Sequence, residues 1–163
     1  MESLIYIQKF TANDFDQYFD LVCNEQVMAM ITERAIPLNE AQRDYAALLF
    51  NNCIHPVFGN YKIYEQQTKR FIGLAKLEIK TIDSVEAELG YMLLPEFWGK
   101  GLGTAVTQLM MSKAMEQPHL KKVIAIIDPT NIPSRKILIN NGFLSEKLCD
   151  FDGLPGEILS RIL

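Results

Sequence analysis

The chain has 163 residues, of which 48% are hydrophobic and 22% charged. This balance is typical of a globular domain with a buried core and excludes a disordered or fibrous chain. The formal net charge of −4 argues against broad nucleic-acid binding, which needs a basic surface. No apolar run approaches the length that spans a membrane. We therefore expect a single domain over residues 1–163, with neither a nucleic-acid nor a membrane partner.

The cysteines and histidines disfavour thiol or metal chemistry. Cys23, Cys53 and Cys149 are far apart and form no Cys-x-x-Cys pair, which indicates reduced thiols. Together with the absence of an apolar segment of signal-peptide length at the N-terminus, they predict a cytoplasmic location. A nucleophilic Cys149 would need a histidine partner, and the sequence offers only His55 and His119. We expect structural thiols, a structural His55 and no metal site.

The first third of the sequence predicts a strand followed by two or three helices. Apolar and polar residues alternate over residues 4–10, the pattern of a strand. Apolar residues then recur at helical spacing from Phe15 to Val22, and a second short helix is expected over residues 25–31. Asn39 and Gln42 have the spacing of a capping box, which predicts that a third helix starts at Asn39.

The rest of the sequence predicts three antiparallel strands and then a crossover. The elements expected here are strands over 57–65, 71–80 and 85–94, a helix over 101–117, a strand over 122–127, a helix over 134–141, and strands over 143–151 and 157–163. Short turns join the first three strands, as in a meander. We expect an α+β layered fold, with a mixed, mostly antiparallel central sheet, helices on both faces and one β–α–β crossover.

Three glycines stand between the last strand of the meander and the helix that follows it. Gly99, Gly101 and Gly103 alternate with other residues, so the backbone N–H groups and the helix N-terminus can converge on an anion. The P-loop pattern G-x-x-x-x-G-K-[ST] does not match here. The dinucleotide pattern G-x-G-x-x-G needs a glycine where the chain has Thr104. A glycine-rich turn without a ligand remains the alternative.

Two longer phrases carry a family resemblance. Residues Gly90–Ala105, GYMLLPEFWGKGLGTA, resemble the acetyl-CoA pyrophosphate loop of the GNAT superfamily of N-acetyltransferases. Residues Asp128–Phe143, DPTNIPSRKILINNGF, resemble the second CoA-proximal segment of that superfamily, in its order and at its separation. Residues 87–91 and the pair Phe97–Trp98 look like the branch that contains ribosomal-protein N-terminal acetyltransferases. The same branch also holds many small-molecule amine acetyltransferases.

The resemblance implies direct transfer of an acetyl group from acetyl-CoA to a primary amine, without a metal. The residues it places at the cofactor are Met92, Leu93, Trp98, Gly99, Lys100, Gly101, Leu102, Gly103, Thr104 and Asn131. Trp98 stands where the superfamily often has Gln or Arg, and an indole cannot repeat a guanidinium–phosphate contact. Backbone donors of the loop are therefore expected to hold the phosphates. The strand before the loop is expected to splay at a bulge, so that N–H groups around Met92 and Leu93 reach the thioester.

Glu88 and Ser134 are the expected catalytic residues. The branch uses a glutamate at the position of Glu88 as a general base, through water. Glu88 lies four residues before Met92, so the two share a strand face. An exposed sheet carboxylate is the alternative for Glu88. Ser134 matches a serine whose hydroxyl can donate to the departing thiolate, or it is only a helix-start residue. Asn131 either bonds the pantetheine arm or caps the helix, and one side chain can do both.

The acceptor amine is expected to be a small molecule or a protein N-terminus. In this fold, the acceptor pocket forms between the first helices and the last turn, here residues 24–38 and 150–155. The acidic side chains expected there are Glu25, Glu33, Asp150 and Asp152. A non-catalytic acyl-CoA sensor or a protein-interaction domain on the same fold is the alternative. The branch tends to form homodimers, and the residues carry no independent signal for one.

Overall fold

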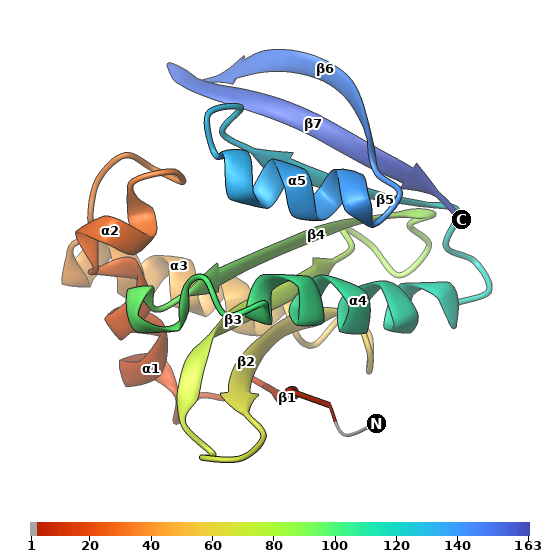
Figure 1. Cartoon of the computed structure of the whole chain (residues 1–163). Helices are drawn as coiled ribbons and strands as arrows, with labels where there is room; N and C mark the ends of the chain where they lie inside the picture. The colour runs from red at the N-terminus through yellow and green to blue at the C-terminus, as the bar shows by residue number, and fades with distance from the viewer. Residues whose placement is uncertain (1–2) are drawn as a thin grey trace.

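The computed structural model describes residues 3–163 and folds them around one seven-stranded sheet with the order β1-β2-β3-β4-β5-β7-β6 (Figure 1). The strands are β1 (Ile5–Lys9), β2 (Gly59–Glu65), β3 (Phe71–Glu78), β4 (Glu86–Leu93), β5 (Lys122–Ile127), β6 (Leu144–Phe151) and β7 (Leu154–Ile162). The helices are α1 (Phe15–Val22), α2 (Glu25–Met28), α3 (Leu38–Asn51), α4 (Leu102–Met115) and α5 (Ile132–Asn140), with a 3-10 turn η1 (Pro95–Phe97). The expected fold class is confirmed.

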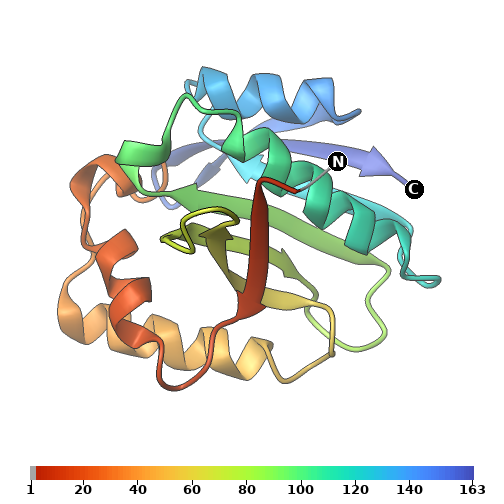
Figure 2. The same ribbon diagram turned by 60° about the horizontal axis from the view of Figure 1, so that its bottom comes forward.

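The helices lie on both faces of the sheet and build two cores. Figures 1 and 2 show α4 and α5 over one face, with α1 and α3 on the opposite side. The helix α4 buries Val106 and Met110 against the first face, in a cluster with Leu77 and Leu89. The second core gathers the apolar side chains of α1, α2 and α3 around Leu74 of β3. The sheet is therefore covered on both faces, so a cavity between its layers needs a gap between two strands.

One parallel strand pair creates such an opening. Within residues 3–163, β4 and β5 are the only parallel neighbours, and α4 is the crossover between them. Their pairing covers Glu86–Glu88 against Lys122–Ile124. Beyond this stretch β4 diverges from the β5–β7–β6 half of the sheet (Figure 1). The carboxyl ends of the two parallel strands thus border a gap in the middle of the sheet.

Element boundaries differ from expectation at several ends, and three of these differences have a local cause. The capping box at Asn39 is wrong, because α3 starts at Leu38 after the extended Pro37 and has no side-chain cap. The helix α5 starts earlier, at Ile132, since Pro133 has a φ suited to the first helical turn. The last hairpin turns in two residues, because both Asp152 (φ 53°) and Gly153 (φ 87°) adopt the left-handed conformation that tight hairpins favour.

Candidate active site

The gap between β4 and β5 opens into a cavity of about 1190 Å³ that reaches both faces of the sheet. On the α4 side it is lined by the glycine loop and the start of α5, including Gly99, Gly101, Leu102, Gly103, Thr104, Asn131 and Ser134. On the α3 side it is lined by residues of α2, α3, β3, β4 and the β6–β7 hairpin, including Glu88. With the exception of Lys100, the residues expected at the cofactor therefore line one cavity together with the expected base.

The glycine loop presents a row of unpaired backbone donors. Gly99 (φ 73°) and Gly101 (φ 78°) adopt the left-handed conformation, and a Cβ atom at either would meet nothing within 4 Å. Among the described residues, no hydrogen bond uses a backbone N–H of residues 99–104 as its donor. Three of these groups belong to the first turn of α4, where the helix dipole adds positive potential. The arrangement suits a phosphate anion.

Trp98 supports the loop through its indole nitrogen. Its Nε1–H donates to the carbonyl oxygen of Leu93 at 2.8 Å, which ties the turn after β4 back to the strand end. Lys100 extends over the ring of Phe97, with Nζ 5.5 Å from the ring centroid. The polar atom of Trp98 is therefore occupied by the chain itself, which leaves the backbone N–H groups and the Thr104 hydroxyl as cavity-lining donors available to an anion.

The alternation of β4 decides which backbone groups face the gap. The N–H of Leu94 donates to Ile72 O on β3 at 2.9 Å, and the β3–β4 register runs without a shift from Leu93 to Glu88. Hydrogen-bonding directions alternate along a strand, so the N–H of Met92 points to β3. The N–H groups of Tyr91 and Leu93 point toward β5 and the gap. Thus the N–H groups of Tyr91 and Leu93 face the gap, and that of Met92 does not. Since the β3–β4 register has no shift, β4 separates from β5 without a bulge against β3.

The start of α5 brings two hydroxyl groups together at the gap. Asn131 Oδ1 accepts from the backbone N–H of Ser134 at 3.4 Å, so it caps the helix. The Ser134 hydroxyl lies 3.3 Å from the hydroxyl of Tyr91. Burial raises the pKa of Tyr91, and the Ser134 hydrogen bond opposes this only in part, so the phenol stays neutral at neutral pH. The Tyr91 hydroxyl therefore lies beside that of Ser134 at the gap, a pairing that the sequence patterns did not predict.

Glu88 forms part of a charged cluster on the other side of the sheet. Lys76 Nζ lies 2.6 Å from Glu88 Oε2 and 3.2 Å from Glu78 Oε1, and Asn60 Nδ2 donates to Glu78 Oε2 at 3.0 Å. Burial acts to lower the pKa of Lys76, but the two carboxylates outweigh it and raise that pKa. A Cβ at Gly90 would meet Lys76 Cε at 2.9 Å, so the missing side chain leaves room for the lysine to cross β4.

This cluster replaces the acidic residues expected at the acceptor pocket. The expected carboxylates Glu25, Glu33, Asp150 and Asp152 are exposed and line no part of the cavity. The expected segments do contribute, through apolar side chains and Gln26, while the carboxylates of the lining come from Asp44, Glu78, Glu88 and Asp128. Lys76 and Glu78 lie on the face of β3 that also carries the buried Leu74, which is an unusual placement for charges. Along the strand they alternate with the buried residues of the other face. That alternation is the sequence signal that would have identified them.

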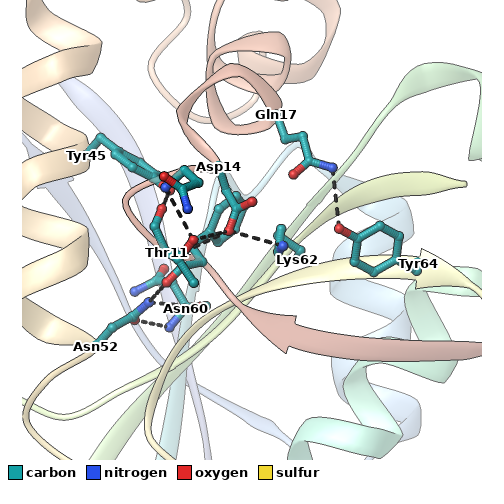
Figure 3. Close-up of polar contacts among 10 residues, drawn as sticks. Thr11, Asp14, Gln17, Tyr45, Asn52, Asn60, Lys62 and Tyr64 are labelled. Atoms are coloured by element: carbon teal, nitrogen blue, oxygen red, sulfur yellow. Dashed lines mark hydrogen bonds and ion pairs between the residues drawn. The ribbon is translucent and has the colours of Figure 1, made fainter.

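A polar network fixes the backbone of Asn60 through Asn52 (Figure 3). Asn52 Oδ1 accepts from the backbone N–H of Asn60 at 2.6 Å, and Asn52 Nδ2 donates to Asn60 O at 3.2 Å. Asp14 pairs with the buried Lys62 at 3.1 Å and accepts from Thr11 N and Oγ1 at 2.8 Å. Burial alone would raise the pKa of Asp14, but the Thr11 hydrogen bonds and Lys62 outweigh it and lower that pKa. The network joins the β1–α1 turn, α3 and β2, and it directs the Asn60 amide at Glu78.

Comparison with known proteins identifies the family. A family model described as "Acetyltransferase (GNAT) domain" matches residues 5–144, and the chain belongs to this family. The similarity extends to the uncharacterized N-acetyltransferase p20 of Bacillus licheniformis, 25% identical over 118 residues, which are 72% of this chain and 66% of the relative. The uncharacterized N-acetyltransferase YoaA of Bacillus subtilis (strain 168) is 27% identical over 84 residues, 52% of this chain and 48% of the relative. The chain thus aligns with less than two thirds of either curated relative.

Solved structures share the fold over nearly the whole chain. A spermidine N-acetyltransferase from Vibrio cholerae in complex with CoA and spermine superposes with a TM-score of 0.81 at 17% identity, covering 99% of this chain and 96% of its own. RimL, a ribosomal L7/L12 alpha-N-protein acetyltransferase in complex with CoA, gives 0.80 at 15% identity, covering 99% and 96%. At these identities the likeness shows the fold alone. The expected GNAT resemblance is confirmed by the family match.

From Ser3 to Leu163, no helix is long and apolar enough to cross a membrane. Over that range, no group of three or more His, Cys, Asp or Glu side chains is arranged to hold a metal ion.

Proposed function

We propose that this chain is an acetyl-CoA-dependent N-acetyltransferase that acetylates a primary amine of a small molecule or a protein N-terminus. The observation that carries the proposal is the continuity of one cavity from the unpaired N–H groups of residues 99–104 to the carboxylate of Glu88. An anion cradle at one end suits the pyrophosphate of CoA. A carboxylate at the other end suits an amine that must lose a proton.

The roles of the residues follow from their places in the cavity. The N–H groups of Leu93 and Tyr91 face the gap, where they can bond the pantetheine arm and polarise the thioester carbonyl. Glu88 takes the proton that the attacking amine loses, through water. The hydroxyl of Tyr91 or Ser134 supplies a proton to the sulfur of CoA when the carbon–sulfur bond breaks. The hydroxyl that donated to sulfur regains a proton from solvent, and Glu88 releases to solvent the proton it took, so no net charge is created.

The names of the fold neighbours support an amine acceptor. One neighbour is a spermidine N-acetyltransferase solved with CoA and spermine, and another is an N-acetyltransferase of a ribosomal protein solved with CoA. Both kinds of acceptor are primary amines, which is the chemistry proposed here. The cysteines Cys23, Cys53 and Cys149 are free thiols, in keeping with a reducing compartment, and we propose a cytoplasmic location as well.

The test combines binding with turnover. Calorimetric titration with acetyl-CoA measures affinity, and release of the CoA thiol across a panel of primary amines measures transfer. Glu88→Gln should lower kcat by about 10²-fold or more, the range of a lost general base, while acetyl-CoA affinity stays within about twofold of the wild type. Glu86→Gln is the matched control, since Glu86 lies on the same strand, is exposed and does not line the cavity.

Each result decides between alternatives. An unchanged kcat in Glu88→Gln would remove Glu88 from the chemistry. Acetyl-CoA binding without turnover on any amine would favour a non-catalytic acyl-CoA sensor or interaction domain. A protein that binds no acetyl-CoA would overturn both readings of the cavity.

A further inference from the structure

We infer that Lys76 is a positioning residue, which holds the carboxylate of Glu88 in place for the proton transfer and does not itself touch the reacting atoms. The inference rests on the proposed function and deepens it, because Glu88 is the base proposed there. Three observations carry it: the route of the lysine across β4, the repulsion that the lysine relieves and the fixed partners on its other side.

Gly90 opens the route by which Lys76 reaches Glu88. Lys76 on β3 is paired directly with Gly90 on β4, and its side chain crosses that glycine to place Nζ 2.6 Å from Glu88 Oε2. A Cβ atom at Gly90 would meet Lys76 Cε at 2.9 Å and Cγ at 3.4 Å. All three residues line the cavity. The ion pair therefore depends on a glycine at this position of β4, and a side chain there would displace the lysine.

Lys76 also separates two carboxylates that would otherwise repel each other. Glu78 and Glu88 are direct partners in the β3–β4 register, and like charges at directly opposed positions destabilise a sheet. The Lys76 ammonium lies 3.2 Å from Glu78 Oε1 as well as 2.6 Å from Glu88 Oε2, so it bridges the two. Without this cation, we expect repulsion from Glu78 to turn the Glu88 carboxylate away.

The other side of the bridge is held in place by buried polar contacts. Asn60, which is 4% exposed, donates from Nδ2 to Glu78 Oε2 at 3.0 Å, and the side chain of Asn52 bonds its backbone (Figure 3). Burial acts to lower the pKa of Lys76, but Glu88 and Glu78 outweigh it and raise that pKa, so the lysine stays a cation at neutral pH. A permanent cation with a fixed second partner can fix the position of the Glu88 carboxylate.

The lysine leaves the carboxylate able to act as a base. An ionised carboxylate has two oxygens and about four acceptor positions, so a contact from one lysine leaves others for water. Glu88 keeps 32% of its side-chain surface exposed and lines the cavity. A base has to lie within hydrogen-bond reach of the proton that it takes, and a displacement of about 1 Å can cost about 10²-fold in rate. Loss of the lysine should therefore lower kcat without removing the base.

A double-mutant cycle tests whether Lys76 acts through Glu88. Thiol release from acetyl-CoA is measured for the wild type, Lys76→Met, Glu88→Gln and the double variant, with saturating spermidine, 2-phenylethylamine or an alanine-initiated peptide amide. On the amine that the wild type turns over fastest, Lys76→Met should lower kcat by about 10- to 100-fold. In the Glu88→Gln background the same change should alter kcat by less than about twofold, because a positioning residue has no effect once its base is gone.

Two further variants and one structure complete the test. Gly90→Ala retains every charge but displaces the lysine, so it should lower kcat in the wild type and leave kcat unchanged in Glu88→Gln. Lys80→Met is the control, because Lys80 follows β3, is exposed and does not line the cavity. Calorimetry should find the acetyl-CoA affinity of Lys76→Met within about twofold of the wild type. Crystal structures of the wild type and Lys76→Met locate the Glu88 carboxylate apart from any turnover, and we expect a displacement of about 1 Å or more.

The outcomes separate this inference from the proposed function. Turnover with none of the amines would count against the function, and the position of the carboxylate in Lys76→Met would then decide the inference by itself. An unmoved carboxylate, an unchanged kcat in Lys76→Met or an equal fall of kcat in both backgrounds would overturn the inference and leave the function standing. A fall of kcat only where Glu88 is present, with a displaced carboxylate, supports it. If Lys76→Met does not fold, Gly90→Ala decides by the same criteria.

Discussion

Replacement of Gly101 by alanine tests whether backbone donors hold the cofactor. Gly101 is the residue before α4 and has φ 78° and ψ 6°. A Cβ there would meet nothing within 4 Å, so the substitution adds strain without adding a clash. Holding alanine in the left-handed conformation costs about 1–2 kcal/mol. For a chain of this length, that cost should lower the melting temperature by about 2–8 °C.

The effect on CoA affinity should exceed the effect on stability. The backbone can relieve the strain by rotating Gly101 out of the left-handed region, which turns the N–H groups of the loop away from the anion. A hydrogen bond to a charged group contributes about 1.5–3 kcal/mol, so loss of one donor should weaken CoA binding by about 10- to 150-fold. The dissociation constant is measured by isothermal titration calorimetry and the melting temperature by differential scanning calorimetry.

The β6–β7 hairpin offers a matched control. Gly153 has φ 87°, and a Cβ there would also meet nothing within 4 Å, but this glycine lies in the turn at the other side of the cavity from the loop. Gly153→Ala should lower the melting temperature to a similar degree and leave CoA affinity unchanged. If Gly101→Ala is destabilised as expected but binds CoA as tightly as Gly153→Ala, the backbone cradle is refuted.

Two other changes probe the supports of the site. Trp98→Phe removes the bond to Leu93 O at a cost of about 1 kcal/mol in thermal unfolding, and CoA affinity should fall less than in Gly101→Ala. A fall as large would show that Trp98 contacts the cofactor itself. Asp14→Asn leaves the buried Lys62 without its carboxylate and should cost about 3 kcal/mol at pH 7 in urea unfolding. Since folding lowers the Asp14 pKa, its contribution is present above the unfolded value near 3.9 and is lost as the pH falls through the folded value. The difference from wild type should therefore shrink at pH 3, whereas the exposed Asp20→Asn should match wild type at both.

Local sequence patterns determined the order of the elements and the glycine loop. Hydrophobic periodicity and turn residues act between near neighbours, so they placed β5 at residues 122–127 and predicted Asn131 as the cap of α5. The loop was predictable for the same reason, because a left-handed backbone before a helix requires residues such as Gly101. Helix starts were less certain, as at Leu38, since several neighbouring residues can begin a helix.

Tertiary structure decided the chemistry around Glu88 and the direction of the donors. Lys76 and Asn60 reach the Glu88 side of the cavity from neighbouring strands, through a register that no local pattern specifies. The choice of Leu93 over Met92 as a donor toward the gap likewise depends on how β4 pairs with β3 and separates from β5. The sequence by itself thus identified the loop suited to acetyl-CoA. Packing across the sheet determined which side chains surround Glu88.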